Sequence, residues 1–210
     1  NIIIKASSNT GAFYAVQSLK TLFAPGLLKS EQQEVWIPSL AVIDEPRFSH
    51  RAFMLDVARN FQPKEEVMKV LDLMALYKLN VFHFHLVEDE GWRLEIPGLP
   101  ELTEVGAHRG HTKDEKHHLL PSYGSGHSID NPAGNGFYSR KDFIEILRYA
   151  KDRHIEVITE IETPGHARAA IKAMDARYTR LKGEGKEEQA LTYLLRDPAD
   201  KSSYESVQGF

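Results

Sequence analysis

Cysteine is absent from the 210-residue sequence, which excludes disulfide bonds and thiolate metal sites within this chain. A large excess of charge is absent too, because 26 Lys and Arg stand against 30 Asp and Glu, for a formal net charge of −4. No cluster of basic residues marks a phosphate-binding face, so nucleic acid is not an expected partner. No apolar run is long enough to span a bilayer. With 41% apolar side chains, the chain has enough material for one sizeable core.

The first 47 residues predict a small unit of strands and one helix. The expected strands cover 1–5, 35–38 and 40–43, and the expected helix has its apolar stripe between residues 13 and 23, after a turn over 8–11. Pro25-Gly26 ends that helix. The polar stretch Asp44-Glu45-Pro46-Arg47 then breaks the pattern, and we expect a domain boundary near residue 47.

From residue 48 onward, strands and helices alternate, which predicts a parallel sheet. The expected strands cover 51–57, 80–86 and 155–161, and the expected helices cover 63–78, 140–153 and the residues from 167. Pro63 suits the start of the first helix, and Ser139 with Asp142 has the spacing of a capping box for the second. A (β/α)₈ barrel needs about 250 residues, so the sheet is either open and doubly wound or part of a barrel.

Residues 97–138 interrupt this alternation with a polar insertion rich in Gly, Pro and Ser that also carries His108, His111, His117, His118 and His127. Insertions of this length inside a compact domain are usually functional or mobile.

Polar residues follow the end of each expected barrel strand, and the carboxyl ends of parallel strands meet at one rim of the sheet. A single acid at such a position usually caps a helix or faces solvent. Three strand ends that each deliver ionisable side chains favour a functional site. The residues concerned are Asp56, Arg59, Glu88, Asp89, Glu90, Glu160, Glu162 and His166.

The strand segment VFHFH places His83 and His85 on one face, as a divalent metal site would require. Buried histidines bonded to backbone or carboxylate groups are commoner than metal ligands, so metal is the minor interpretation. Trp92 could stack on a sugar ring, but a place in the core is at least as well supported.

Three segments, HRAFMLDVARNF, LMALYKLNVFHFHLVEDEGWRLEI and GFYSRKDFIEILRYAKDRHIEVITEIETPGHA, resemble in that order the opening of the family 20 glycoside hydrolases, the β-N-acetylhexosaminidases. GAFYAVQSLKTLF and VWIPSLAVIDEPRF resemble the end of the small α+β domain that precedes the barrel in that family. The resemblance implies an α/β fold in which 1–47 close the α+β domain. Residues 48–210 would then carry the first three or so βα units of a (β/α)₈ TIM barrel, with the insertion at about 97–138.

The same resemblance implies an enzyme that removes terminal β-linked N-acetylglucosamine or N-acetylgalactosamine with retention. The nucleophile would be the oxygen of the substrate's own 2-acetamido group. The implied partners are glycans or oligosaccharides that end in N-acetylhexosamine, such as chitobiose. No metal or organic cofactor is implied, and a periplasmic or extracellular location is expected.

Residue by residue, Arg59 matches the arginine that binds the C3 and C4 hydroxyls of the sugar. Glu88 and His166 match an acid and a histidine that hold the acid/base group in place without contacting the substrate. Asp89 is assigned the same supporting role. Glu162 matches a further acid beside that histidine. The family commonly has Asp where Glu88 and Glu162 stand, and His where Asn60 stands.

The catalytic Asp-Glu pair of the family follows a glycine-rich strand end later in the barrel, and nothing similar precedes Phe210. Asp44-Glu45 and Asp114-Glu115 are in the wrong places to substitute for it. We therefore expect no catalytic residue within this chain, the acid pair beyond Phe210, and an inactive chain if it is produced alone. Two alternatives stay open: a metal-dependent barrel hydrolase that uses His83 and His85, and a glycan-binding protein without catalysis.

Overall fold

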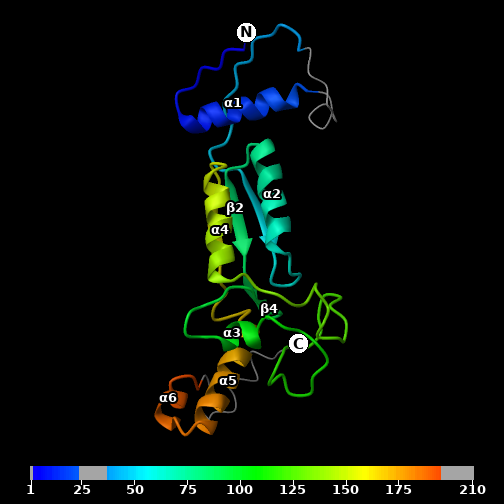
Figure 1. Ribbon diagram of the computed structural model, residues 1–210, viewed down its shortest axis with the longest axis vertical. Coiled ribbons are helices and arrows are strands. Elements are labelled where there is room, and N and C mark those ends of the chain that lie inside the picture. Colours follow the sequence, from blue (N-terminus) through cyan, green and yellow to red (C-terminus); the bar gives the residue numbers. More distant parts are fainter. Residues whose placement is uncertain (1, 24–36, 195–210) are drawn as a thin grey trace.

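The computed structural model describes residues 2–23 and 37–194 (Figure 1). No helix in these residues is long and apolar enough to cross a membrane. The elements in chain order are α1 (Asn9–Thr21), β1 (Ala52–Asp56), α2 (Lys64–Leu76), β2 (Val81–His85), β3 (Val87–Glu88), β4 (Gly91–Trp92), α3 (Glu101–Glu104), α4 (Arg140–Lys151), β5 (Glu156–Glu160), α5 (Arg168–Gly183) and α6 (Glu187–Leu191).

The central feature is a parallel three-stranded sheet in the order β1-β2-β5. Ala52 lies opposite Val81 on β2, and His85 at the end of β2 lies opposite Glu160. Helices α2 and α4 flank this sheet, and α3, α5 and the long insertion lie beyond the carboxyl ends of its strands (Figure 1). The expected alternation of strands and helices is therefore confirmed, with element ends within a few residues of the expected ones.

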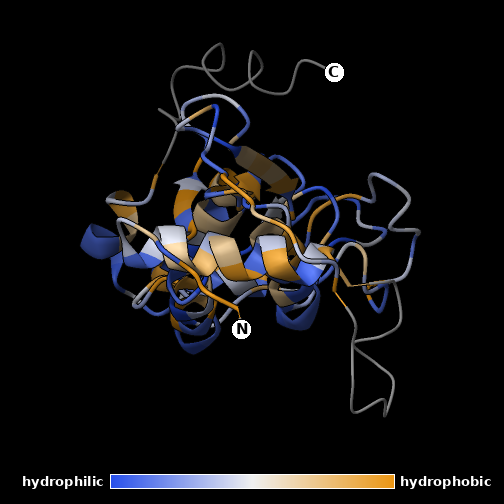
Figure 2. Ribbon diagram, turned by 90° about the horizontal axis from the view of Figure 1, so that it is seen from above, coloured by the Kyte–Doolittle hydropathy of each residue, from blue (hydrophilic) through white to orange (hydrophobic). Residues whose placement is uncertain are grey.

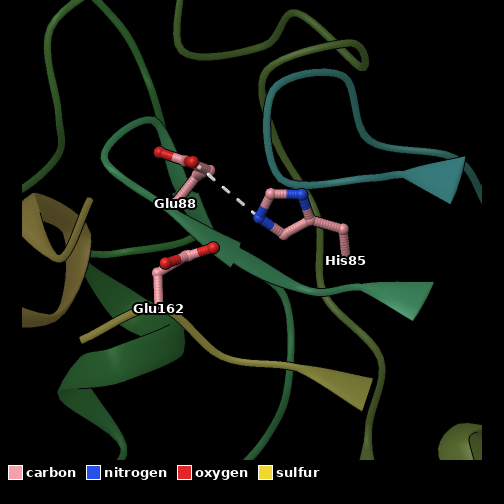
Figure 3. A group of neighbouring side chains, drawn as sticks. All are labelled: His85, Glu88 and Glu162. Carbon is pink, nitrogen blue, oxygen red and sulfur yellow. Dashed lines mark ion pairs between the residues drawn. The ribbon is translucent and has the colours of Figure 1, made fainter. Parts of the chain in front are cut away.

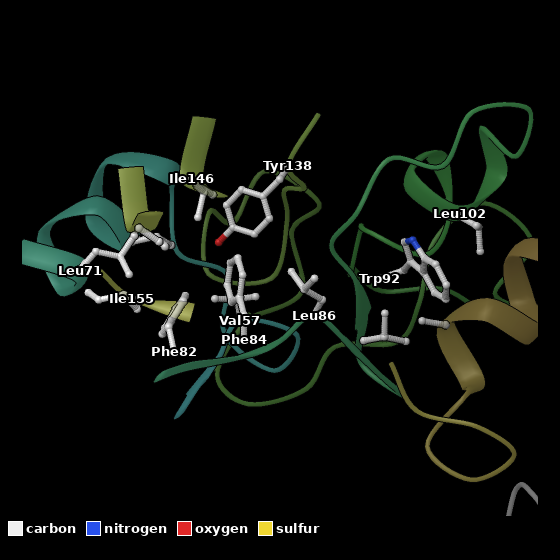
Figure 4. Packing of buried hydrophobic residues seen from close by; sticks show 14 of the residues in the cluster. Val57, Leu71, Phe82, Phe84, Leu86, Trp92, Leu102, Tyr138, Ile146 and Ile155 are labelled. Atoms are coloured by element: carbon white, nitrogen blue, oxygen red, sulfur yellow. The ribbon is translucent and has the colours of Figure 1, made fainter. Parts of the chain in front are cut away.

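The core lies on the face of the sheet that carries Phe82 and Phe84, both fully buried. Their ring centroids are 4.9 Å apart, and Tyr138 packs against Phe84 at 5.3 Å (Figure 4). Because side chains alternate along a strand, His83 and His85 lie on the opposite face. Trp92 is 9% exposed and belongs to the same apolar cluster, as the core interpretation of its sequence expects.

The strands expected over 1–5 and 40–43 are wrong. Residues 2–5 and 37–43 form no strand, although Ile2 and Ile3 line a cavity together with Leu19 of α1, and the apolar start of the chain runs beside that helix (Figure 2). A strand requires a neighbour that pairs its backbone N–H and C=O groups, and the described residues place none there. Positions 1, 24–36 and 195–210 lie outside the described residues, so the strand expected over 35–38 is only partly covered.

The helix of this unit is confirmed as α1. The Ser8 hydroxyl accepts a hydrogen bond from the Gly11 N–H at 3.0 Å and caps its start. The domain boundary near residue 47 stays a prediction.

Helix α4 begins with the capping box that the sequence predicts. The Ser139 hydroxyl accepts from the Asp142 N–H at 3.1 Å, and the Asp142 carboxylate accepts from the Ser139 N–H at 3.2 Å. Two N–H groups that an uncapped helix would leave without partners are thus satisfied.

Replacing this cap by Ser139→Ala should destabilise α4 by about 1 kcal/mol. Hydrogen exchange of the α4 amides should then be about fivefold faster, because exchange reports the free energy of local opening. Lys141→Ala is the control, since the Lys141 side chain in the same turn is 85% exposed. Equal acceleration in both variants would contradict the role of the cap.

The insertion has a fixed base and an exposed tip. Arg109 and Tyr138 at its base are 0% and 1% exposed, whereas Tyr123 near its tip is 62% exposed. Bridges join Leu94 to Tyr138 and Arg109 to Leu119, and α3 is the helix of this segment in the described residues.

Candidate active site

Arg59, Glu88 and His166 meet beyond the carboxyl ends of the three parallel strands. Arg59 follows β1, Glu88 ends β3 just after β2, and His166 follows β5. Arg59 Nη2 lies 2.6 Å from Glu88 Oε1, and His166 Nδ1 lies 2.7 Å from the same oxygen. The structure therefore brings together three residues that are up to 107 positions apart in the sequence (166 minus 59).

Glu88 is the centre of this cluster and is only 2% exposed. A buried carboxylate is costly unless charges and hydrogen bonds compensate for the lost water, and Arg59 and His166 supply both. The backbone N–H of Asp89 adds a further bond to Glu88 Oε2 at 2.9 Å. His85 Nε2 is 3.8 Å from Glu88 and closer, at 3.0 Å, to the Val87 carbonyl (Figure 3).

Arg59 also pairs with two other acids. Its Nη1 donates to Asp56 Oδ2 at 2.8 Å, and its Nε lies 3.5 Å from Glu90 Oε2. Asp56 Oδ1 accepts from the Ala58 and Arg59 N–H groups and so fixes the start of the loop. Burial opposes the charge of Arg59, but the hydrogen bond that Arg59 donates to Asp56 and the charges of the surrounding carboxylates outweigh burial and raise the pKa of Arg59. Arg59 therefore pairs with Asp56 and lies at the carboxyl rim of the sheet.

His166 is exposed on one side and bound to Glu88 on the other, with a side-chain exposure of 59%. The hydrogen bond to Glu88 and the charge of Glu88 raise the pKa of His166, against a smaller effect of burial. His166 does not cap the next helix. Instead Asp89 Oδ1 accepts from the Arg168 N–H at 2.9 Å at the first turn of α5. Asp89 thus links the β3 turn to the segment that carries His166.

Glu160 and Glu162 form a second carboxyl pair beside this cluster. The hydrogen bond with Glu160, followed by burial and the Glu160 charge, raises the pKa of Glu162. Burial also disfavours charge on Glu160, but the bond from Glu162 and the nearby His85 and His83 outweigh it and lower its pKa. Of the two carboxyl groups, Glu162 is therefore the one that accepts a proton more readily.

The metal interpretation of His83 and His85 finds little support in the geometry. His83 Nε2 pairs closely with Glu160, and His85 Nδ1 lies 3.8 Å from the same carboxylate. Within residues 2–23 and 37–194, two groups of side chains have spacings that could hold an ion, and His83 belongs to neither. They are His85 with Glu88 and Glu162, and Glu88 with Asp89 and His166. Both use Glu88, whose charge Arg59 and His166 already compensate.

Sequence reasoning missed two fully buried arginines next to this cluster, Arg93 and Arg109. Arg93 stands in an otherwise largely apolar stretch after Trp92, and that contrast was the available signal. It also missed Glu115, which is 5% exposed in the insertion and pairs with Arg168 of α5.

The model of the catalytic domain of glycosyl hydrolase family 20 matches residues 48–208. The N,N'-diacetylchitobiase of Vibrio harveyi is 54% identical over 207 residues, which cover 99% of this chain and 23% of that protein. Beta-hexosaminidase B of Pseudoalteromonas piscicida is 49% identical over 210 residues, which cover 100% of this chain and 26% of that protein. The chain thus spans about a quarter of the length of these relatives.

Solved structures show the same family. The GH20 exo beta-N-acetylglucosaminidase of Vibrio harveyi, in complex with N-acetylglucosamine, matches with a TM-score of 0.70 and 38% identity over 81% of this chain and 25% of that one. The beta-N-acetylhexosaminidase of Bacteroides fragilis matches with a TM-score of 0.64 and 37% identity over 84% and 31%. These matches confirm that the parallel sheet with its helices is part of a (β/α)₈ barrel. The chain belongs to glycosyl hydrolase family 20.

Proposed function

We propose that the complete protein containing this chain removes terminal β-linked N-acetylglucosamine or N-acetylgalactosamine from glycans with retention of configuration. The observation that carries the proposal is the cluster of Arg59, Glu88 and His166 at the carboxyl rim of a family 20 barrel. The carboxyl ends of barrel strands are where such folds hold their substrates.

In this proposal the oxygen of the substrate's 2-acetamido group attacks the anomeric carbon. The bond from that carbon to the leaving oxygen breaks, and a glutamic acid gives the leaving oxygen its proton. The resulting glutamate then takes a proton from water, which attacks the same carbon. The bond between that carbon and the acetamido oxygen breaks, so the acetamido group is restored and the sugar leaves with retained configuration. We place that acid, together with its aspartate partner, C-terminal to Phe210.

The residues of this chain would bind and orient. Arg59 offers planar N–H donors that suit the adjacent C3 and C4 hydroxyls. Glu88 holds Arg59 on one side and His166 on the other, so it fixes the sugar-binding group relative to the supporting histidine. Glu162 is bonded to Glu160, and this bond, followed by burial and the Glu160 charge, raises the Glu162 pKa, so this carboxyl group accepts a proton more readily than a free one.

The proposal is tested by release of p-nitrophenol from the N-acetyl-β-glucosaminide and N-acetyl-β-galactosaminide by the complete protein. Activity on at least one substrate is expected, and inactivity on both would refute the proposal. A protein that binds N-acetylglucosamine but releases no product would be the glycan-binding alternative.

Prolonged dialysis against a chelator should leave the rate unchanged. Loss of activity that zinc restores would favour the metal-dependent reaction at His83 and His85.

A further inference from the structure

Two arginines beside the loop that carries Arg59 are fully buried and bound by backbone carbonyls. Arg93 and Arg109 are both 0% exposed. Burying a cation costs several kcal/mol unless its donors find partners, so such residues persist only where they hold something in place. Burial and the neighbouring Arg109 charge lower the pKa of Arg93 to about 9, which leaves it charged at neutral pH.

Arg93 uses all five N–H donors of its guanidinium. Its Nε donates to the Val57 carbonyl at 3.0 Å, and its Nη2 donates to the Ala58 carbonyl at 2.7 Å. The remaining donors go to three carbonyls of the insertion, at 3.0 to 3.2 Å, those of Ala107, Gly134 and Gly136. Arg93 therefore joins the end of β1 to both ends of the insertion.

Arg109 holds the next residue of the same loop. Its Nη2 donates to the carbonyl of Arg59 itself at 2.7 Å and to that of Ala133 at 3.4 Å. Its Nη1 reaches the Glu90 carbonyl at 3.3 Å. Three consecutive carbonyls, those of Val57, Ala58 and Arg59, are thus held by two buried guanidinium groups.

We infer that Arg93 and Arg109 are positioning residues for Arg59, and that through them the insertion sets the sugar-binding geometry of the site. This inference rests on the proposed function, because it assigns to Arg59 the sugar hydroxyls. Asp56 holds the N–H groups of Ala58 and Arg59, and the two arginines hold the carbonyls, so the loop is fixed from both sides.

Gly91 shows how tightly this arrangement is packed. A Cβ atom at position 91 would lie 2.6 Å from the Ala58 carbonyl oxygen and 2.6 Å from the Arg93 guanidinium. Only glycine leaves room for that hydrogen bond. The turn that carries Glu88 and Glu90 is therefore fitted to the loop that carries Arg59.

The test is a double-mutant cycle in the complete protein with Arg109→Met and Arg59→Met. A displacement of about 1 Å can cost roughly a hundredfold in rate, so Arg109→Met should lower kcat/KM for the p-nitrophenyl substrate by about tenfold or more. In a protein that already carries Arg59→Met, Arg109→Met should lower kcat/KM by less than about twofold, since the guanidinium group that Arg109 positions is gone. Arg109→Lys keeps the positive charge but lacks the planar N–H donors of a guanidinium group, so the loss in kcat/KM should be intermediate.

Arg177→Met is the matched control. Arg177 is a partly buried arginine, with a side chain that is 13% exposed, and it binds Glu101 of α3 at 2.8 Å, away from the Arg59 loop. As in Arg109, its buried Nε has no hydrogen-bond partner among the described residues. Its effect on kcat/KM should be the same with or without Arg59. If the loss in kcat/KM of the double variant equals the product of the losses of Arg109→Met and Arg59→Met, the inference is overturned.

Hydrogen exchange gives a second readout that needs no activity. Arg109→Met should speed exchange at Val57 to Phe61, and Arg177→Met should not. If the unmodified protein hydrolyses neither substrate, the proposed function fails, and exchange alone then decides the positioning. Unchanged exchange at Val57 to Phe61 in Arg109→Met would refute it.

Discussion

Replacing Arg59 with methionine should lower kcat/KM of the complete protein for the p-nitrophenyl N-acetyl-β-glucosaminide by at least about a hundredfold. Hydrogen bonds from a charged donor contribute about 1.5–3 kcal/mol each, and Arg59 would lose two to the sugar hydroxyls. Since about 1.4 kcal/mol is a factor of ten, the two bonds account for the expected loss. Steady-state kinetics on purified variants measures it.

The same substitution should leave the protein folded, because the Arg59 side chain is 27% exposed, Asp56 and Glu90 can regain water, and His166 still pairs with the buried Glu88. Arg153→Met is the control: Arg153 is similarly exposed, at 22%, and pairs with Asp72 at 2.7 Å near the end of α4. Its kcat/KM should match that of the unmodified protein. An Arg59→Met variant with unchanged kcat/KM would remove Arg59 from the site.

Glu88→Gln should have the second largest effect, because it removes the charge to which both Arg59 and His166 are bound. We expect kcat/KM to fall by about tenfold or more as Arg59 loses its buried partner. The pKa of the His166 ring should fall as well, since the Glu88 bond and charge are what raise it. Titration of the His166 ring protons by NMR measures that change directly.

The sign of the linked stability effect follows from the raised pKa of His166. A histidine whose pKa is higher in the folded state stabilises the fold below its unfolded pKa, and this contribution is lost as pH rises through the folded pKa. The fall in thermal midpoint caused by Glu88→Gln should therefore be larger below about pH 6.5 than well above the folded pKa. Glu145→Gln, which alters a partly exposed acid bound to Lys64 at 2.7 Å, is the control. An unchanged His166 titration in Glu88→Gln would contradict the pairing.

The barrel segment was predictable because its signals are local. Ser139 and Asp142 mark a helix start whatever surrounds them. The apolar run around Phe82 and Phe84 is typical of a strand that is buried inside an α/β fold. The prediction of strands in the N-terminal unit failed because strand formation depends on distant parts of the chain. Ile2 and Ile3 have the composition of a strand, but a strand exists only beside another, and the described residues provide none.

The meeting of Arg59, Glu88 and His166 was predictable from the order of parallel strands, although the distances were not. The buried arginines lay beyond that reasoning. The carbonyls that Arg93 binds stand 14 to 43 residues away in the sequence, and carbonyls occur at every position. No pattern of side chains therefore reveals which ones a guanidinium will reach. The similarity to solved family 20 structures supplied what periodicity could not, the barrel of which this sheet is a part.

Because the insertion has a fixed base and an exposed tip, a fluorescent label at the tip can measure the motion of this segment. Since these 210 residues contain no cysteine, Tyr123→Cys at the tip would add the only thiol of this chain, at a position that is 62% exposed in the native structure. A fluorophore attached there would report the motion of the tip, while Arg109 keeps the base in place. A change in its depolarisation that appears only with longer sugars would show that the tip takes part in their binding.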